Sequence, residues 1–245
     1  MATIAVYSLK GGVGKTTLAV NLAWCAARNS ARRTLLWDLD PQAASTYILT
    51  PRKKQGDRAQ AIFTKDVAAR KLVRHSDVEG LDLIGADRSL RQLDHVFHEL
   101  DKKKRLAKLL GELDGDYDRL VLDCPPGLTE TSEQVMRAAD IIIVPVVPSP
   151  LSIRAFQEVE EHIAKLGKKG APLMPVHSMV DRRRTLHRES IERHPEWPVI
   201  PMASAIEAMG VHRAPLGSYS PRSAASKAFA DLWRAIETRL AGRGK

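Results

Sequence analysis

A glycine-rich segment at residues 10–17 constrains the fold of this chain more than any other stretch. It reads Lys-Gly-Gly-Val-Gly-Lys-Thr-Thr and stands between a β-rich stretch at 3–8 and a stretch at 16–28 with apolar residues at helical spacing. In a glycine-rich turn between a strand and a helix, backbone N–H groups and the positive helix end point to one place. We therefore expect this segment to bind phosphate groups.

The residue types in this segment match what nucleotide binding requires. Lys15 places a cation against the β- and γ-phosphates, Thr16 supplies a hydroxyl for Mg²⁺, and Thr17 is expected to reach the α-phosphate. The usual P-loop spacing puts a glycine at position 9, where this chain has Leu9, and Lys10 precedes the glycine pair instead. The expected nucleotide-binding residues are Lys10, Gly11, Gly12, Val13, Gly14, Lys15, Thr16 and Thr17.

Strand-like and helix-like stretches alternate along the rest of the chain, without a long linker or an internal repeat. The most apolar run, 140–147, is expected to be a central strand buried on both faces. The pattern predicts an α/β fold: one P-loop NTPase domain over residues 1–245, with a mostly parallel twisted sheet covered by helices on both faces. Further strands are predicted at 33–37, 81–85, 119–124, 173–179 and 199–201, helices at 88–111, 150–166, 184–194 and 221–241, and helical pieces within 42–78.

Acidic residues follow two of the predicted strands, at the sheet edge where the loop also lies. Asp40 can orient the attacking water or accept its proton, and it can reach a metal through water. Asp123 ends an apolar strand and is expected to hold Mg²⁺ directly or through water. Asp38 either assists through the metal's water shell or caps a helix. Residues 125–127, Pro-Pro-Gly, are expected to sense the γ-phosphate.

Taken together, these motifs resemble the ParA family of partition ATPases, which is related to MinD. The resemblance runs over nearly the full length of the chain and is closest to the small members, which lack an N-terminal helix-turn-helix. It implies weak ATP hydrolysis with Mg²⁺, stimulated by a partner protein and by DNA, with Lys10, Lys15 and Asp40 as catalytic residues. The matching segments are the deviant Walker A motif at 10–17, Asp-Leu-Asp-Pro-Gln at 38–42, Leu-Asp-Cys-Pro-Pro-Gly at 122–127, Val-Ile-Pro at 199–201 and Tyr-Ser-Pro at 219–221.

The resemblance also implies a cycle of assembly. Lys10 would reach across a dimer interface to the partner's phosphates, so that the ATP form is a homodimer and the apo or ADP form a monomer. The dimer would bind nonspecific double-stranded DNA of the nucleoid in the cytoplasm, and a ParB-like or other cargo adaptor would stimulate its release. The adenine pocket is expected around residues 179–181 and 201–202.

The net charge of +9 is concentrated in two regions. Residues 51–75 hold eight Lys/Arg against two Asp/Glu, and residues 182–245 hold twelve against six. Such regions indicate a polyanionic partner, although a basic surface without a partner is an equal alternative. The candidate DNA-binding residues are Arg182, Arg183, Arg184, Arg188, Arg213, Arg222 and Arg234.

Two other classes of function stay open at this point. A MinD-like membrane-cycling ATPase would need an amphipathic anchor, and residues 229–240 carry an apolar stripe at helical spacing. We expect this stripe to pack on the sheet, so a membrane partner is disfavoured. A metabolic P-loop enzyme, such as an iron-protein-like reductase, is disfavoured because Cys25 and Cys124 lack the placement for a shared cluster.

Overall fold

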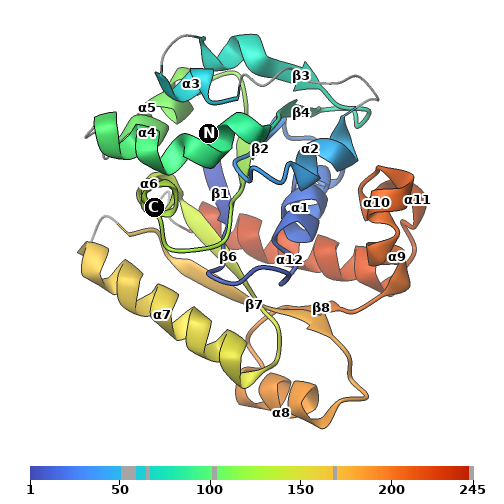
Figure 1. The fold of residues 1–245 in the computed structure, drawn as a ribbon. Helices are drawn as coiled ribbons and strands as arrows, with labels where there is room; N and C mark the ends of the chain where they lie inside the picture. Colours follow the sequence, from blue (N-terminus) through green and yellow to red (C-terminus); the bar gives the residue numbers. More distant parts are fainter. Residues whose placement is uncertain (51–58, 65–66, 101–103, 168–169, 243–245) are drawn as a thin grey trace.

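An eight-stranded sheet organises the computed structural model of this chain (Figure 1). The structure describes residues 1–50, 59–64, 67–100, 104–167 and 170–242. The strand order is β3-β4-β2-β5-β1-β6-β7-β8, and neighbouring strands are parallel except for the β3–β4 pair. This mostly parallel sheet confirms the predicted α/β fold. The strands are β1 (Ala2–Val6), β2 (Thr34–Asp38), β3 (Val73–His75), β4 (Leu81–Ile84), β5 (Arg119–Asp123), β6 (Ile141–Val146), β7 (Leu173–Val180) and β8 (Val199–Pro201).

Helices cover both faces of this sheet (Figure 1). On one face, α1 (Lys15–Asn29) and α12 (Ala224–Ala241) pack against each other and against the strands. The opposite face carries a second apolar cluster, to which the short helix α3 (Ala61–Thr64) and four longer helices contribute. The four longer helices are α4 (Leu93–Leu100), α5 (Arg105–Glu112), α6 (Glu130–Ala138) and α7 (Pro150–Leu166). The predicted coverage of both faces is confirmed.

Strand β1 lies in the middle of the sheet, between β5 and β6. Its last residue, Val6, is paired with Asp123 of β5 and with Ile143 of β6. Every residue of β6 is buried, which confirms the prediction of a central strand at 140–147. The glycine-rich segment therefore leaves the centre of the sheet at the carboxyl edge of the parallel strands, where such folds bind ligands.

The apolar stripe of α12 faces the core. Phe229, Leu232 and Trp233 are each 1% exposed, and the indole nitrogen of Trp233 donates a hydrogen bond to the Ser30 hydroxyl at 2.8 Å. The prediction that this stripe packs on the sheet is confirmed. Among the described residues, no helix has both the length and the apolar character needed to cross a bilayer.

The prediction of one long helix at 88–111 is wrong. The segment begins with a 3-10 turn, η2 (Arg88–Gln92), and continues as the separate helices α4 and α5, of which α5 starts after the non-helical residue Lys104. Leu93 and Leu106 both face the core. Thirteen residues correspond to about 3.6 turns of an α-helix, so one straight helix would carry these two side chains on nearly opposite faces. A break between them lets both be buried.

Several short elements were not predicted individually. The polar region 42–78 contains helical pieces, as expected, but also the edge strand β3. Residues 51–58 and 65–66 of that region lie outside the described residues. Three short helices connect β8 to α12. The remaining helices are α2 (Ala44–Leu49), η1 (Ala69–Leu72), α8 (Thr185–Arg193), α9 (Ser204–Glu207), α10 (Met209–His212) and α11 (Leu216–Tyr219).

Candidate phosphate-binding site

The glycine-rich segment forms a tight turn that ends at the first residue of α1. Gly12 and Gly14 have φ values of +71° and +92°, a region in which a side chain is strained. Leu9, which replaces the usual first glycine, is half-buried against the core, and its carbonyl accepts a hydrogen bond from the Gly127 amide at 3.2 Å. Leu9 is not among the described residues with positive φ, so this position does not need glycine.

A serine from β7 supports the turn from outside. The Ser178 hydroxyl, which is nearly inaccessible to solvent, donates a hydrogen bond to the Val13 carbonyl at 2.7 Å. A Cβ atom on Gly14 would stand 3.0 Å from this hydroxyl oxygen. Ser178 was not predicted as a functional residue, because in the sequence it is only a polar residue near the end of a buried strand. It holds the turn at the distance that only glycine permits.

Lys15, the first residue of α1, keeps its ammonium group inside the turn. The side chain is buried, and Nζ donates a hydrogen bond to the Lys10 carbonyl at 2.8 Å. Burial lowers the pKa of Lys15, and the nearby charges of Asp123 and Asp40 oppose this shift. The loop therefore presents one cation in a partly desolvated place, where attraction for an anion is strong.

Two carboxylates end the neighbouring strands β2 and β5 directly opposite each other. Asp38 and Asp123 are paired in register, and both are fully buried. Burial raises the pKa of each, and the negative charge of Asp123 raises that of Asp38 further. Hydrogen bonds from Ser45 and Thr16 oppose the shift of Asp123.

The two carboxylates have different partners. Asp38 accepts hydrogen bonds from the Thr46 amide at 2.9 Å, the Thr46 hydroxyl at 2.7 Å and the Asp40 amide at 3.1 Å. This set favours the capping alternative for Asp38, because Thr46 lies in the first turn of α2. Asp123 Oδ2 accepts a hydrogen bond from the Ser45 hydroxyl at 2.6 Å, whereas its buried Oδ1 has no hydrogen-bond partner among the described residues.

The orphaned Oδ1 of Asp123 fits a divalent cation. Mg²⁺ is commonly held by one or two carboxylates together with water and substrate phosphates. Within the described part of the chain, no three His, Cys, Asp or Glu residues form a metal cluster, so a protein-only cage is not present there. Asp123 and the adjacent Thr16 hydroxyl are the groups that would hold the ion beside a phosphate.

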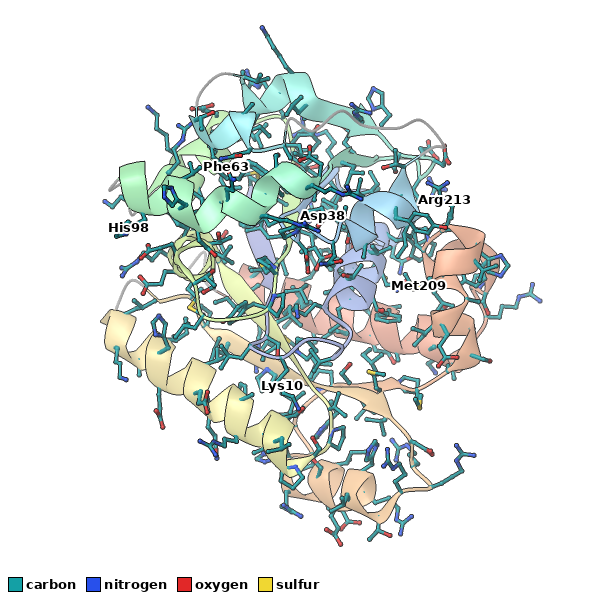
Figure 2. The ribbon with its side chains drawn as sticks, in the orientation of Figure 1. Lys10, Asp38, Phe63, His98, Met209 and Arg213 are labelled. Atoms are coloured by element: carbon teal, nitrogen blue, oxygen red, sulfur yellow. The ribbon has the colours of Figure 1, made fainter. Side chains whose placement is uncertain are left out.

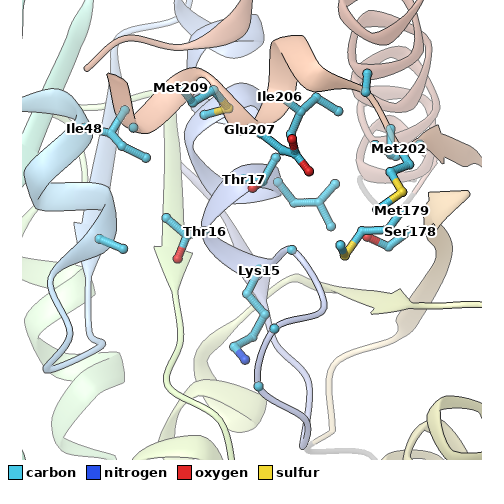
Figure 3. Close-up of a pocket in the computed structure, with 18 of the residues that line it drawn as sticks. Lys15, Thr16, Thr17, Ile48, Ser178, Met179, Met202, Ile206, Glu207 and Met209 are labelled. Atoms are coloured by element: carbon cyan, nitrogen blue, oxygen red, sulfur yellow. The ribbon is translucent and has the colours of Figure 1, made fainter. Parts of the chain in front are cut away.

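A cavity of about 590 Å³ extends from the turn across the carboxyl edge of the sheet (Figure 3). At one end it is lined by the turn and by Asp40, whose Oδ1 accepts a hydrogen bond from the Gln42 amide at 2.9 Å. The other end is mostly apolar and contains one carboxylate, Glu207. This shape suits a ligand with an anionic end and a flat apolar end. The lining at that second end includes Met179, Ile200, Pro201, Met202, Ile206, Glu207 and Met209.

The structure brings most of the predicted loop residues to this cavity. Gly11, Gly12, Gly14, Lys15, Thr16 and Thr17 line it, whereas Lys10 and Val13 are not among its lining residues. Lys10, which is labelled in Figure 2, is half-buried, and its ammonium group makes no ion pair with the described residues. Of the predicted adenine-pocket residues, Met179, Pro201 and Met202 line the cavity, while Asp181 is paired with Arg183 at 2.9 Å.

The predicted DNA-binding arginines fall into two groups. The side chains of Arg182, Arg184 and Arg222 are exposed and have no hydrogen-bond or ion-pair partner in the described parts of the chain. The others are already engaged. Arg183 pairs with Asp181, Arg234 pairs with Asp231, Arg188 donates to the carbonyls of residues 182 and 183, and Arg213 donates to the carbonyls of Tyr47 and Thr50.

The sequence is similar to a family model and to known proteins. A family model described as an AAA domain matches residues 1–174. The chain is 31% identical over 254 residues to a virulence plasmid ParA family protein, pGP5-D, of Chlamydia psittaci. That match covers 98% of this chain and 96% of the relative.

Solved structures share the fold. Apo McdA from Cyanothece superposes with a TM-score of 0.81 at 21% identity, covering 96% of this chain and 99% of that one. A cobyrinic acid a,c-diamide synthase from Mycobacterium smegmatis, solved with an ATP analogue and magnesium, gives a TM-score of 0.80 at 24% identity, covering 98% and 95%. At these identities the likeness concerns the fold alone, which proteins with different activities share.

Proposed function

The chain belongs to the ParA family of partition and positioning ATPases, and from that premise we propose that it is an ATP-driven positioning switch. In this proposal, ATP binding makes a sandwich dimer that binds DNA without sequence preference, and an adaptor protein stimulates the hydrolysis that releases it. The observation that carries the proposal is the placement of the glycine-rich turn, a buried lysine and an orphaned carboxylate oxygen at one end of a cavity large enough for a nucleotide.

The proposed ligand is ATP with Mg²⁺. The amides of the turn and the Lys15 ammonium bind the phosphates, and Thr17 approaches the α-phosphate. Thr16 and Asp123 would hold the metal, which would neutralise charge on the phosphates. The apolar end of the cavity, with Met179 and Met202, encloses the base. The ATP analogue and magnesium in the cobyrinic acid a,c-diamide synthase structure support this choice.

Hydrolysis requires a positioned water and stabilisation of the charge that develops on the phosphates. Asp40 lines the phosphate end of the cavity and is proposed to orient the water. Lys15 and Lys10 are proposed to supply positive charge. Because Lys10 stands outside the cavity of its own chain and has no acidic partner among the described residues, a second copy facing the turn could receive it. The trans role of Lys10 makes dimerisation part of the catalytic cycle.

Mixed dimers test the trans role directly. We expect Lys10→Ala and Asp40→Ala each to lose ATP turnover, and Lys71→Ala, which removes an exposed lysine elsewhere, to keep it. Mixing the first two variants should restore about one quarter of wild-type turnover, because half of the dimers are then mixed and each has one complete site. No restoration in dimers shown to be mixed, or unchanged turnover in Lys10→Ala, would refute the trans role.

The proposed polyanion is cytoplasmic nucleoid DNA. Arg182, Arg184 and Arg222 offer guanidinium groups that have no partner in the described segments and can bind phosphates without reading bases. A gel shift on random-sequence DNA with ATP, ADP and no nucleotide tests this proposal, and retention only with ATP supports it. The membrane-cycling alternative predicts retention on anionic liposomes instead, but the apolar stripe of α12 is buried. Cys25 and Cys124 are buried free thiols, which disfavours a shared metal cluster.

A further inference from the structure

Arg213 connects two walls of the nucleotide cavity. Its Nε donates a hydrogen bond to the Tyr47 carbonyl at 3.0 Å, and its Nη2 donates to the Thr50 carbonyl at 2.8 Å. The guanidinium also lies over the Tyr47 ring, 4.6 Å from the centroid. Both carbonyls belong to the carboxyl end of α2, where backbone oxygens lack helical partners and attract a cation. Arg213 therefore caps α2 from a segment more than 160 residues away.

The segment that carries Arg213 is attached to the core on both sides of that residue. Met209, which begins α10, is buried, and its sulfur accepts a hydrogen bond from the Asn21 side chain of α1 at 3.2 Å. Asn21 also accepts a hydrogen bond from the Leu216 amide at 2.9 Å, just beyond α10. Arg213 itself has φ +49°, an uncommon conformation for a residue other than glycine. Arg213 is thus a strained residue that directly follows α10, and α2 packs beside α10 (Figures 1 and 2).

The helix that Arg213 caps holds both buried carboxylates. Ser45 of α2 donates to Asp123, and Thr46 donates to Asp38 through its amide and its hydroxyl. The Thr46 hydroxyl also accepts a hydrogen bond from the Ala86 amide at 2.8 Å. With six residues, α2 is too short to be stable alone, so its position depends on such contacts. A shift of α2 would move the groups that orient Asp123.

We propose that Arg213 is a positioning residue of the ATP site, which fixes α2 so that Ser45 and Thr46 hold Asp123 and Asp38 in place for magnesium. This inference rests on the proposed function and reassigns Arg213 from the DNA-binding set to the nucleotide site. Outer groups that orient metal ligands typically change metal affinity by 10- to 100-fold, which is the size of effect expected here. Because α2 and α10 both line the cavity, the same contact also joins two parts of its wall.

The experiment compares Arg213→Met and Arg213→Lys with Arg91→Met, which removes an exposed arginine without such contacts among the described residues. The first measurement is hydrogen exchange of α2 amides in the nucleotide-free protein. The Thr46 and Thr50 amides are hydrogen-bonded at 2.9 Å each, to Asp38 and to the Thr46 carbonyl. We expect them to exchange at least 10-fold faster in Arg213→Met and at the wild-type rate in Arg91→Met. This readout does not depend on ATP hydrolysis.

The second measurement is the Mg²⁺ concentration that gives half-maximal ATP turnover. We expect an increase of about 10-fold or more in Arg213→Met, and a smaller increase in Arg213→Lys because an ammonium cannot cap two carbonyls and stack on Tyr47 together. Absence of turnover in the wild-type protein would refute the proposed function, while the exchange result would still decide the role of Arg213. Wild-type exchange and wild-type Mg²⁺ dependence in Arg213→Met, with loss of DNA retention alone, would overturn the inference.

Discussion

Gly14→Ala tests the close approach of β7 to the phosphate-binding turn. An L-residue in the left-handed region costs roughly 1–2 kcal/mol, and Gly14 has φ +92°. The new Cβ would also stand 3.0 Å from the Ser178 oxygen and force that hydroxyl away from the Val13 carbonyl. Losing this buried hydrogen bond costs about 1 kcal/mol. We therefore expect the free energy of unfolding to fall by about 2–3 kcal/mol.

Urea denaturation measures this change, and Gly11→Ala is the matched control. Gly11 belongs to the same turn, but its φ lies outside the left-handed region and an added Cβ would have no neighbour within 4 Å. Its replacement by alanine should change the free energy of unfolding by less than about 0.5 kcal/mol. A Gly14→Ala variant as stable as Gly11→Ala would show that the turn is not strained at position 14.

A double variant separates the steric contact from the backbone strain. Ser178→Ala alone removes the hydrogen bond to Val13, and in the Gly14→Ala background it also removes the atom that the new Cβ would meet. The double variant should therefore be more stable than the sum of the single effects by about 1 kcal/mol. Strict additivity would refute the proposed contact between Gly14 and Ser178.

Three further predictions concern the carboxylates and the basic surface. Because burial raises the pKa of Asp38 in the folded state, Asp38 contributes stability to the nucleotide-free protein that is fully present below the ordinary carboxylate pKa and is lost as pH rises through the raised value. Urea titrations from about pH 4 to 9 should therefore show a flatter dependence in Asp38→Asn, and an unchanged slope would contradict this assignment. Ser45→Ala removes the 2.6 Å hydrogen bond to Asp123 and should lower the free energy of unfolding by about 1–3 kcal/mol, while the exposed Ser204→Ala should leave it unchanged. Arg182→Ala with Arg184→Ala should reduce the slope of log affinity for random DNA against log salt by nearly two, whereas Arg234→Ala, whose guanidinium already pairs with Asp231, should change it less.

Except for the edge strand β3, the strands of the described chain were predictable because their signal is local. Segments 119–124 and 140–147 each contain a continuous apolar run, and in a sheet covered on both faces such runs have no other place to be buried. The prediction for residues 88–111 was wrong because the charged residues of this region favour a helix throughout. The break between α4 and α5 depends instead on how the apolar residues of each helix meet the core. The short helices between β8 and α12 lack the length that makes periodicity visible.

The site was predictable to the extent that it lies in motifs. The spacing of residues 10–17 and of Asp40 predicts phosphate binding and the positioning of a water molecule. The structure places most of these residues around one cavity. The residues that orient them come from distant segments: Ser178 is 165 residues from Val13, and Ser45 is 78 residues from Asp123. A local sequence pattern cannot predict hydrogen bonds between segments so far apart in the sequence. The same holds for Asp38, because the sequence does not show that the Thr46 amide donates a hydrogen bond to it, and this bond favours capping over assistance through the metal's water shell.

The bond from Ser178 to Val13 has a consequence for the order of events during synthesis. During translation the glycine-rich turn is made well before the strand that supports it, because Ser178 follows Val13 by 165 residues. Contacts of such sequence separation form late, because a long loop must be closed before they contribute. A nascent chain that ends before residue 178 therefore lacks a finished phosphate cradle. The support of the turn by β7 therefore becomes available only after residue 178 has been made.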